Sequence, residues 1–201
     1  MARLAIIGTG IMGGLHAQEI ATRKGVSIAA CCDIQPERSR AFAERYKIPR
    51  WYVDYEELLD KEHIDGVINA TIDAMHMPVA LAVFKRTLPL LSEKLMADSL
   101  DNARRMFETA QKASVPAMVN FTYRNAPCLQ AAAKFIRDGG IGRVMHVEAS
   151  YLQSWLVQAA WGDWRTDPAW TWRLSTKHGS SGVLGDLGCH IYDLATFLCG
   201  D

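Results

Sequence analysis

The sequence lacks an excess of charge of either sign, and it lacks long apolar runs. Lys plus Arg and Asp plus Glu number 22 each, so the formal net charge is zero. A balanced chain offers no strongly basic surface of the kind that binds nucleic acid or anionic lipid. No apolar run approaches the roughly 20 residues of a membrane-spanning helix. We therefore expect no nucleic-acid partner and no membrane partner.

The cysteines lack a framework spacing. The five are an odd number, and Cys31 and Cys32 lie in an apolar segment, so buried, reduced thiols and a cytoplasmic location are expected. Repeats and low-complexity tracts are also lacking. Apolar residues make up 49% of the 201 residues, enough for a sizeable core. This length suggests one domain and part of a second.

The N-terminal segment carries the most informative motif. An apolar run from Leu4 leads into Gly8-Thr-Gly10-Ile-Met-Gly13, and a helical pattern follows over 15–23. G-x-G-x-x-G between a strand and a helix is typical of a dinucleotide turn, in which the second glycine lets the backbone approach a pyrophosphate. A purely structural turn is the alternative interpretation. The residues of this turn expected to bind the cofactor are Gly8, Gly10, Ile11, Met12 and Gly13.

Asp33 strengthens the dinucleotide interpretation. It ends a second apolar strand, over 26–32, and follows Gly8 at close to the spacing of about 20 residues expected for the acid that binds the adenosine ribose. A carboxylate there accepts the ribose hydroxyls and repels a 2′-phosphate. We therefore predict NAD rather than NADP, although Arg38 could turn toward a phosphate.

Strands and helices alternate through the first part of the chain. This pattern predicts an α/β fold with a doubly wound parallel sheet, a Rossmann domain, over 1–120. Asp54, Asp73 and either Asp98 or Ser99 are expected to cap helices. The expected strands are 4–7, 26–32, 50–53, 66–70, 88–91 and 116–120, and the expected helices are 15–23, 36–46, 54–59, 76–85 and 99–113.

The pattern changes after residue 120. A helix over 126–137 and an alternating strand over 144–154 predict the start of an α+β domain over 121–201. A tryptophan-rich segment follows, which could stack on sugar rings, line an active-site wall, or serve core or subunit contacts. Its members are Trp155, Trp161, Trp164, Trp170 and Trp172.

Two later stretches carry possible chemistry. Lys94 follows a predicted strand and could reach a substrate oxygen, or could be a solvated surface residue. Near the end of the sequence, helical spacing puts Asp186, His190, Asp193 and Phe197 on one face. An imidazole one turn from a carboxylate suits proton transfer near neutral pH. A satisfied His–Asp pair and half of a zinc site are the alternatives, and without an obvious third ligand we expect no metal.

Six motifs together resemble the glucose–fructose oxidoreductase / inositol dehydrogenase / MocA (Gfo/Idh/MocA) family. The resemblance covers the whole chain, and its most specific part is the last motif. The six are Gly8-x-Gly10-x-x-Gly13; Ala70-Thr71 with His76, similar to A-T-P-x-x-x-H; Glu93-Lys94, similar to E-K-P; Tyr123-Arg124 with Pro127, similar to Y-R-x-x-P; Trp172-Arg173; and Gly182-x-Leu184-x-Asp186-x-Gly188-x-His190-x-x-Asp193.

The resemblance implies roles for individual residues. Lys94 would hold the reacting hydroxyl, His190 would be the general base, and Asp186 would orient His190 or the substrate, all three converging on one pocket beside Gly10 and His76. Thr71, Asp73 and His76 would lie near the cofactor, with Glu93 at the nicotinamide ribose. The expected substrate contacts are Tyr123, Arg124, Trp172, Arg173 and Asp193.

Two residues depart from the family motifs. Ile72 and Leu95 replace the prolines of A-T-P and E-K-P. A cis bond before a non-proline residue costs about 3 kcal/mol, so we predict a trans peptide between Lys94 and Leu95.

Family members also continue well past residue 201. We therefore expect a longer native protein that forms a homodimer or homotetramer through the sheet of its second domain.

The resemblance implies an NAD-dependent dehydrogenase that acts on a sugar, polyol or related cyclic alcohol. Two alternatives stay open, namely a glycosidase that uses NAD transiently and a non-catalytic NAD-binding regulatory protein. Retention of Lys94, Asp186 and His190 argues against the regulatory alternative, because a binding module has no need of them.

Overall fold

The computed structural model describes residues 1–154, 156–158, 162–167, 172–175 and 180–200. The chain divides into two compact units, Met1–Asn120 and Phe121–Asp201.

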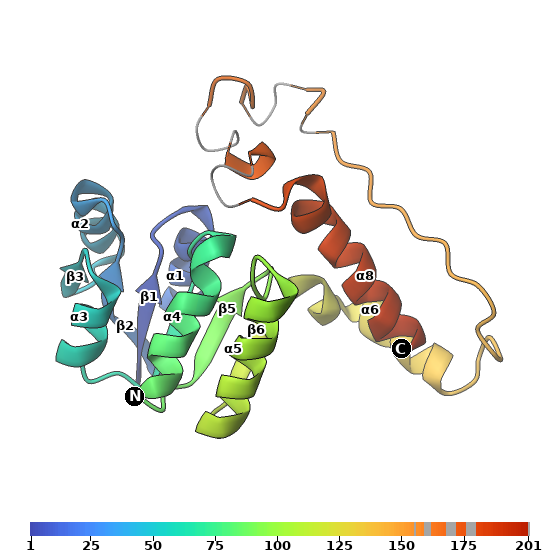
Figure 1. Cartoon of the computed structure of the whole chain (residues 1–201), viewed down its shortest axis with the longest axis horizontal. Helices are drawn as coiled ribbons and strands as arrows, with labels where there is room; N and C mark the ends of the chain where they lie inside the picture. The colour runs from blue at the N-terminus through green and yellow to red at the C-terminus, as the bar shows by residue number, and fades with distance from the viewer. Residues whose placement is uncertain (155, 159–161, 168–171, 176–179, 201) are drawn as a thin grey trace. The chain divides into compact units, whose positions relative to one another are not determined.

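The first unit is a six-stranded parallel sheet with helices between the strands (Figure 1). Its strand order, β3-β2-β1-β4-β5-β6, reverses between β1 and β4, so the predicted doubly wound Rossmann fold is confirmed. The strands are β1 (Ala2–Ile7), β2 (Val26–Cys32), β3 (Arg50–Tyr52), β4 (Gly66–Asn69), β5 (Leu90–Glu93) and β6 (Ala117–Asn120), and the helices are α1 (Ile11–Ala21), α2 (Pro36–Tyr46), α3 (Tyr55–Lys61), α4 (Asp73–Lys85) and α5 (Leu100–Ala113).

Alternation along the central strand separates two apolar cores. Ala5 and Ile7 of β1 join the cluster that includes α3, α4 and α5, whereas Ile6 joins the cluster of α1 and α2. Successive side chains of a strand point to opposite faces, so one strand supplies both cores. Cys31 and Cys32 divide in the same way, and both are buried as expected.

Helix ends agree with the sequence at most positions. The Asp54 carboxylate accepts from the Glu56 N–H at 2.8 Å, and the Ser99 hydroxyl accepts from the Asn102 N–H at 3.3 Å, so both predicted caps are confirmed. Asp73 is instead the first residue of α4, after Ile72 at the N-cap. Helix α1 begins at Ile11 rather than residue 15, because the tight glycine turn leads directly into it.

Among its described residues, the regular structure of the second unit is helical. Helix α6 (Pro127–Arg137) follows a short 3₁₀ turn, η1 (Thr122–Asn125), and another 3₁₀ turn, η3, spans Trp172–Leu174. A π-helical turn, η5 (Leu184–Gly188), leads into α8 (Cys189–Cys199). The expectation that Asp186 and His190 lie on one regular α-helix is therefore wrong, because Asp186 lies in the π-helical turn.

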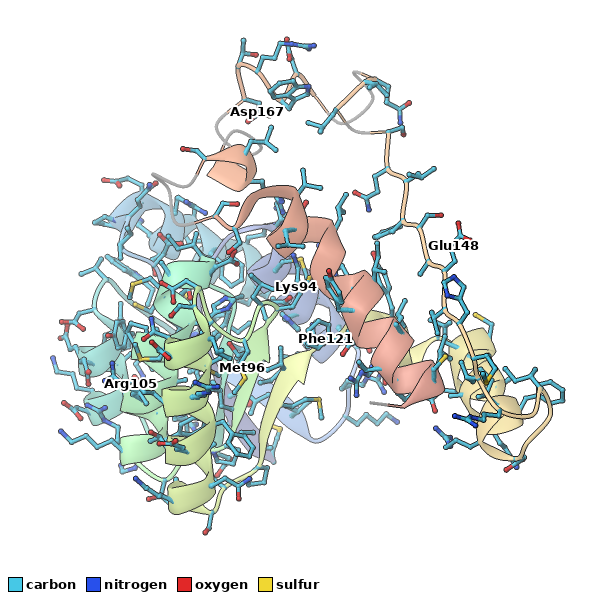
Figure 2. All side chains as sticks on the ribbon, turned by 45° about the vertical axis from the view of Figure 1, so that its right-hand side comes forward. Lys94, Met96, Arg105, Phe121, Glu148 and Asp167 are labelled. Atoms are coloured by element: carbon cyan, nitrogen blue, oxygen red, sulfur yellow. The ribbon has the colours of Figure 1, made fainter. Side chains whose placement is uncertain are left out.

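The strand expected over 144–154 is not formed. Figure 2 shows Glu148 on an extended segment, and no strand pairs with this segment among the described residues. An alternating sequence favours an extended backbone, but a strand also needs a hydrogen-bonded neighbour.

Within the described ranges, every helix is too short or too polar to cross a bilayer.

Candidate functional site

The three glycines of the N-terminal turn face different surroundings. A Cβ on Gly8, whose φ is +96°, would lie 2.4 Å from the Ala70 carbonyl oxygen, and a Cβ on Gly13 would lie 2.2 Å from the Gly8 oxygen. A Cβ on Gly10 would meet only the end of the Arg38 side chain, at 3.6 Å. Gly8 and Gly13 are therefore required for packing, whereas Gly10 borders space that a ligand can enter.

The start of α1 fits a phosphate group. Gly10 is its N-cap and provides no side-chain cap, so the first N–H groups of the helix keep their hydrogen-bonding capacity. Ile11 is exposed and Met12 is half-buried in this turn. The backbone around Gly10 thus has the donors and the space that a pyrophosphate needs.

Asp33 lies at the end of β2, against the glycine turn. Its Oδ2 accepts from the Thr9 N–H at 3.1 Å and from the Thr9 hydroxyl at 2.7 Å, and its Oδ1 accepts from the Gln35 N–H at 3.1 Å. Arg38 Nη2 lies 3.9 Å from Oδ2. The Asp33 carboxylate is therefore held in place beside the turn, with the Arg38 cation nearby. A carboxylate at this position can accept hydrogen bonds from the ribose hydroxyls of NAD.

Polar residues at the end of β4 and after it form a hydrogen-bonded cluster. Asn69 Oδ1 accepts from the Thr71 hydroxyl at 2.7 Å, and Asn69 Nδ2 donates to the His76 carbonyl at 3.3 Å. The His76 ring is fully buried, with Nδ1 2.5 Å from the Leu95 oxygen and Nε2 3.1 Å from the Thr71 oxygen. His76 thus presents no side-chain surface to a ligand and holds the surrounding backbone instead, while Asp73 lies buried in the first turn of α4.

Glu93 ends β5 beside two donors. His16 Nε2 lies 2.8 Å from Glu93 Oε1, and Asn120 Nδ2 donates to the same oxygen at 2.7 Å. Burial raises the pKa of the Glu93 carboxyl, but the hydrogen bonds from His16 and Asn120 lower it more, so the net pKa is below its ordinary value. Glu93 is therefore a fixed carboxylate near neutral pH.

Lys94 follows directly, half-buried at the end of β5 (Figure 2). The peptide between Lys94 and Leu95 is cis, so the prediction of a trans bond is wrong. That prediction used only the local preference of the bond. The Leu95 oxygen is also held by a long-range contact to His76, which neighbouring sequence does not reveal.

His190 of α8 lies in an aromatic pocket of the second unit. Its ring centroid is 4.6 Å from that of Tyr123, 6.1 Å from Phe121 and 6.4 Å from Tyr151. The two tyrosine hydroxyls lie 2.6 Å apart. This hydrogen bond, together with burial, raises the pKa of Tyr123 to about 12, so its hydroxyl stays neutral at ordinary pH.

Two ion pairs hold the remaining charged candidates of the second unit. Arg124 donates from Nε to both oxygens of Asp193 at 2.9 Å, and its guanidinium lies 5.1 Å from the Phe197 ring centroid. Arg173 Nε lies 3.7 Å from Asp186 Oδ1. Arg124 and Asp193 thus join η1 to α8, a contact that orients the helix bearing His190.

A hollow of about 250 Å³ adjoins Asp186 in the same unit. Tyr151, Gln153 and Asp186 supply its polar lining, and Gln153 Nε2 donates to the Tyr151 hydroxyl at 2.5 Å. The other lining residues are Leu152, Leu156, Leu174, Val183 and Leu187. The walls of the hollow are therefore mostly apolar, with the Tyr151 hydroxyl and the Gln153 amide bonded to each other.

Only part of the tryptophan cluster can be placed. Trp155, Trp161 and Trp170 lie outside the described residues, and Trp172 is known only as the first residue of η3. Trp164 Nε1 donates to the Leu156 carbonyl at 2.9 Å, and Arg165 lies 4.7 Å from its ring centroid.

Sequence reasoning missed several polar residues of the site, namely Thr9, His16, Asn69, Asn120 and Tyr151. Asn69 and Asn120 are the last residues of β4 and β6, and polar residues at the carboxyl ends of parallel strands are a signal that could have found them. His16 has no such signal, because its partner Glu93 is distant in sequence. No cluster of three His, Cys, Asp or Glu side chains able to hold a metal occurs in the described parts of the chain.

Known proteins share both units. The family model "Oxidoreductase family, NAD-binding Rossmann fold" matches residues 2–121, and "GFO/IDH/MocA C-terminal domain" matches 129–201. Levoglucosan dehydrogenase of Pseudarthrobacter phenanthrenivorans is 28% identical over 98% of this chain and 51% of its own. A glycosyl hydrolase family 109 protein of Stenotrophomonas maltophilia is 29% identical over 74% of this chain and 35% of its own.

The structure of levoglucosan dehydrogenase in complex with NADH and L-sorbose matches with a TM-score of 0.89 and 26% identity, over 100% of this chain and 53% of that one. The chain spans about half the length of the curated relatives it matches. Because the family models together match most of its residues, the chain belongs to the Gfo/Idh/MocA oxidoreductase family.

Proposed function

We propose that the protein is an NAD-dependent oxidoreductase that transfers a hydride between the nicotinamide and a sugar, polyol or related cyclic alcohol. The observation that carries this proposal is the turn in which Gly10 borders open space beside the fixed carboxylate of Asp33. Relatives named as levoglucosan, D-apiose and inositol dehydrogenases support the substrate class.

The cofactor would be held by the first unit. Gly8, Gly10 and Gly13 shape the turn, Ile11 and Met12 begin the helix that faces the phosphates, and Asp33 accepts the ribose hydroxyls. Glu93 would bind the nicotinamide ribose, with Thr71 and Asp73 near the cofactor. NAD supplies a hydride acceptor when bound.

The proton chemistry is assigned to Lys94, Asp186 and His190. Lys94 would hold the reacting hydroxyl through its ammonium group, which favours the developing alkoxide. His190 would accept the hydroxyl proton, and Asp186 would orient His190 or the substrate. Tyr123, Arg124, Trp172, Arg173 and Asp193 are the proposed substrate contacts, although Arg124 and Asp193 already pair with each other and so also act by positioning.

A glycosidase that uses NAD transiently is the second candidate, favoured by the similarity to a glycosyl hydrolase family 109 protein. The two functions differ in net redox change. A panel of sugars, polyols and glycosides with NAD distinguishes them. A dehydrogenase accumulates NADH, which is measured by its absorbance, whereas a glycosidase releases its aglycone without net NADH. Tight NAD binding with neither product would contradict both and favour a regulatory protein.

We further propose a cytoplasmic homodimer or homotetramer. Light scattering of the native protein measures its mass directly, and a monomer at assay concentration would contradict this part of the proposal.

A further inference from the structure

His16 connects two separate parts of the dinucleotide site. It lies in the second turn of α1, whose N-terminus faces the proposed pyrophosphate position, and its Nε2 is 2.8 Å from Oε1 of Glu93 at the end of β5. In the sheet, β4 separates β1 from β5. The contact therefore crosses the point between β1 and β4 where the strand order reverses, which is where ligands bind in doubly wound sheets.

The carboxylate that receives this contact has little freedom. Asn120 Nδ2 donates to the same Oε1 at 2.7 Å, from the end of β6. The Glu93 side chain is 7% exposed and the His16 side chain 16%. Two donors on one oxygen fix the rotamer of the carboxylate, and charge-assisted hydrogen bonds of this kind are stronger than neutral ones.

We propose that His16 is a positioning residue for the nicotinamide half of the cofactor, acting by fixing the Glu93 carboxylate and the adjoining Lys94 across the strand-order reversal. This inference rests on the proposed function, because it assigns the Glu93 end of the site to the nicotinamide ribose. Nothing in the G-x-G-x-x-G motif requires a histidine at this position.

The competing explanation is that His16 only packs α1 against the sheet. The two explanations differ in which ligand they affect. A packing role would weaken binding of every ligand at α1, including ADP, which occupies only the adenosine and pyrophosphate end. A positioning role would weaken binding of NAD⁺ and leave ADP binding unchanged.

The experiment measures dissociation constants for NAD⁺ and ADP by calorimetry, on the whole protein and three variants of His16. His16→Gln places an amide N–H donor at about the position of Nε2, whereas His16→Asn places one at about the position of Nδ1. His16→Leu has no donor. We expect His16→Leu and His16→Asn to weaken NAD⁺ binding by about 10–100-fold, the usual effect of losing a hydrogen bond to a charged group. His16→Gln should restore most of the affinity, and ADP should bind all variants equally.

Matched controls separate this effect from damage to the fold. His63 is exposed in the loop after α3, so His63→Leu should leave both constants and the melting temperature unchanged. Asn120→Ala removes the other donor to Oε1 and should show the same NAD⁺-selective loss, which keeps the test valid if His16→Leu does not fold.

Three results would overturn the inference. Equal loss of NAD⁺ and ADP affinity in His16→Leu would mean a packing role. Unchanged NAD⁺ affinity in both His16→Leu and Asn120→Ala would mean that Glu93 needs no such support. Failure of the unmodified protein to bind NAD⁺ would overturn the proposed function as well, which distinguishes that failure from the first two.

Discussion

The His76 ring lies between two backbone carbonyls, with Nδ1 2.5 Å from the Leu95 oxygen and Nε2 3.1 Å from that of Thr71. A single buried side chain of α4 thus contacts the loops that follow β4 and β5. Together with the His16–Glu93 contact, it places a histidine partner on each side of Lys94, one at the preceding residue and one at the following residue.

The first prediction concerns this ring. His76→Ala leaves a cavity at a fully buried side chain and removes its contacts to two backbone carbonyls, so we expect it to lower the free energy of unfolding by about 2–4 kcal/mol. Denaturant titration measures this change. His63→Ala, at an exposed histidine, should change it by less than about 0.5 kcal/mol, and equal effects of the two substitutions would contradict the structural role of His76.

The second prediction separates the glycines of the turn. Gly13→Ala brings a Cβ within 2.2 Å of the Gly8 oxygen and should lower the melting temperature strongly, whereas Gly10→Ala meets no backbone and should fold normally. The methyl group of Gly10→Ala instead occupies the space that a pyrophosphate needs, so NAD⁺ affinity should fall at least about tenfold. Calorimetry and thermal melting test the pair, and normal NAD⁺ binding by Gly10→Ala would count against the cofactor site.

Local patterns predicted the first unit well. Strand 26–32 and helix 36–46 have the predicted bounds, because a short apolar run and the Pro36 start are signals contained in the segment itself. The expected strand over 144–154 failed for the opposite reason. Its alternation describes which face would be covered, while its formation depends on a neighbouring strand that the segment cannot supply.

The residues of the candidate site also fall into those that local sequence predicts and those that it does not. The glycine turn and Asp33 could be read from spacing, since each depends on one strand-to-helix connection. His16 and Asn120 could not, because each joins the site through a contact to Glu93, which is distant in the chain. The aromatic surroundings of His190 similarly combine Phe121, Tyr123 and Tyr151, which no helical periodicity connects.

The third prediction tests cofactor choice. The wild type should bind NAD⁺ more tightly than NADP⁺, because the Asp33 carboxylate repels a 2′-phosphate. Asp33→Ser removes the charge and leaves Arg38 close by, so it should reverse the preference, weakening NAD⁺ binding by about 10–100-fold. The ratio of the two dissociation constants is the measurement, with Arg38→Ala in the same background expected to abolish any gain for NADP⁺. Tighter binding of NADP⁺ by the wild type would refute the assignment.

The fourth prediction follows from the lowered pKa of Glu93. A carboxyl whose pKa is lower in the folded state stabilises the protein at every pH above its ordinary pKa of 4.5. This stabilisation is lost as the pH falls through the lower pKa of the folded state. The stability difference between wild type and Glu93→Gln should therefore be constant near neutral pH and decrease below pH 4.5. Unfolding by urea at several pH values measures it. A difference that grows as pH falls would have the wrong sign and would show that the carboxylate is not stabilised by His16 and Asn120.

The fifth prediction tests His190 as the general base. His190→Ala removes the proton acceptor, and acid–base catalysis usually contributes about 10²–10⁴-fold, so kcat should fall by that amount with little change in NAD⁺ affinity. Tyr192→Phe is the matched control, because Tyr192 is exposed on the same helix and has no assigned role in the site. Added imidazole should restore part of the activity of His190→Ala by supplying a base in solution, whereas it cannot repair misplaced packing. A low rate that imidazole leaves unchanged, with Tyr192→Phe at the wild-type rate, would assign His190 to the aromatic packing of α8 rather than to proton transfer.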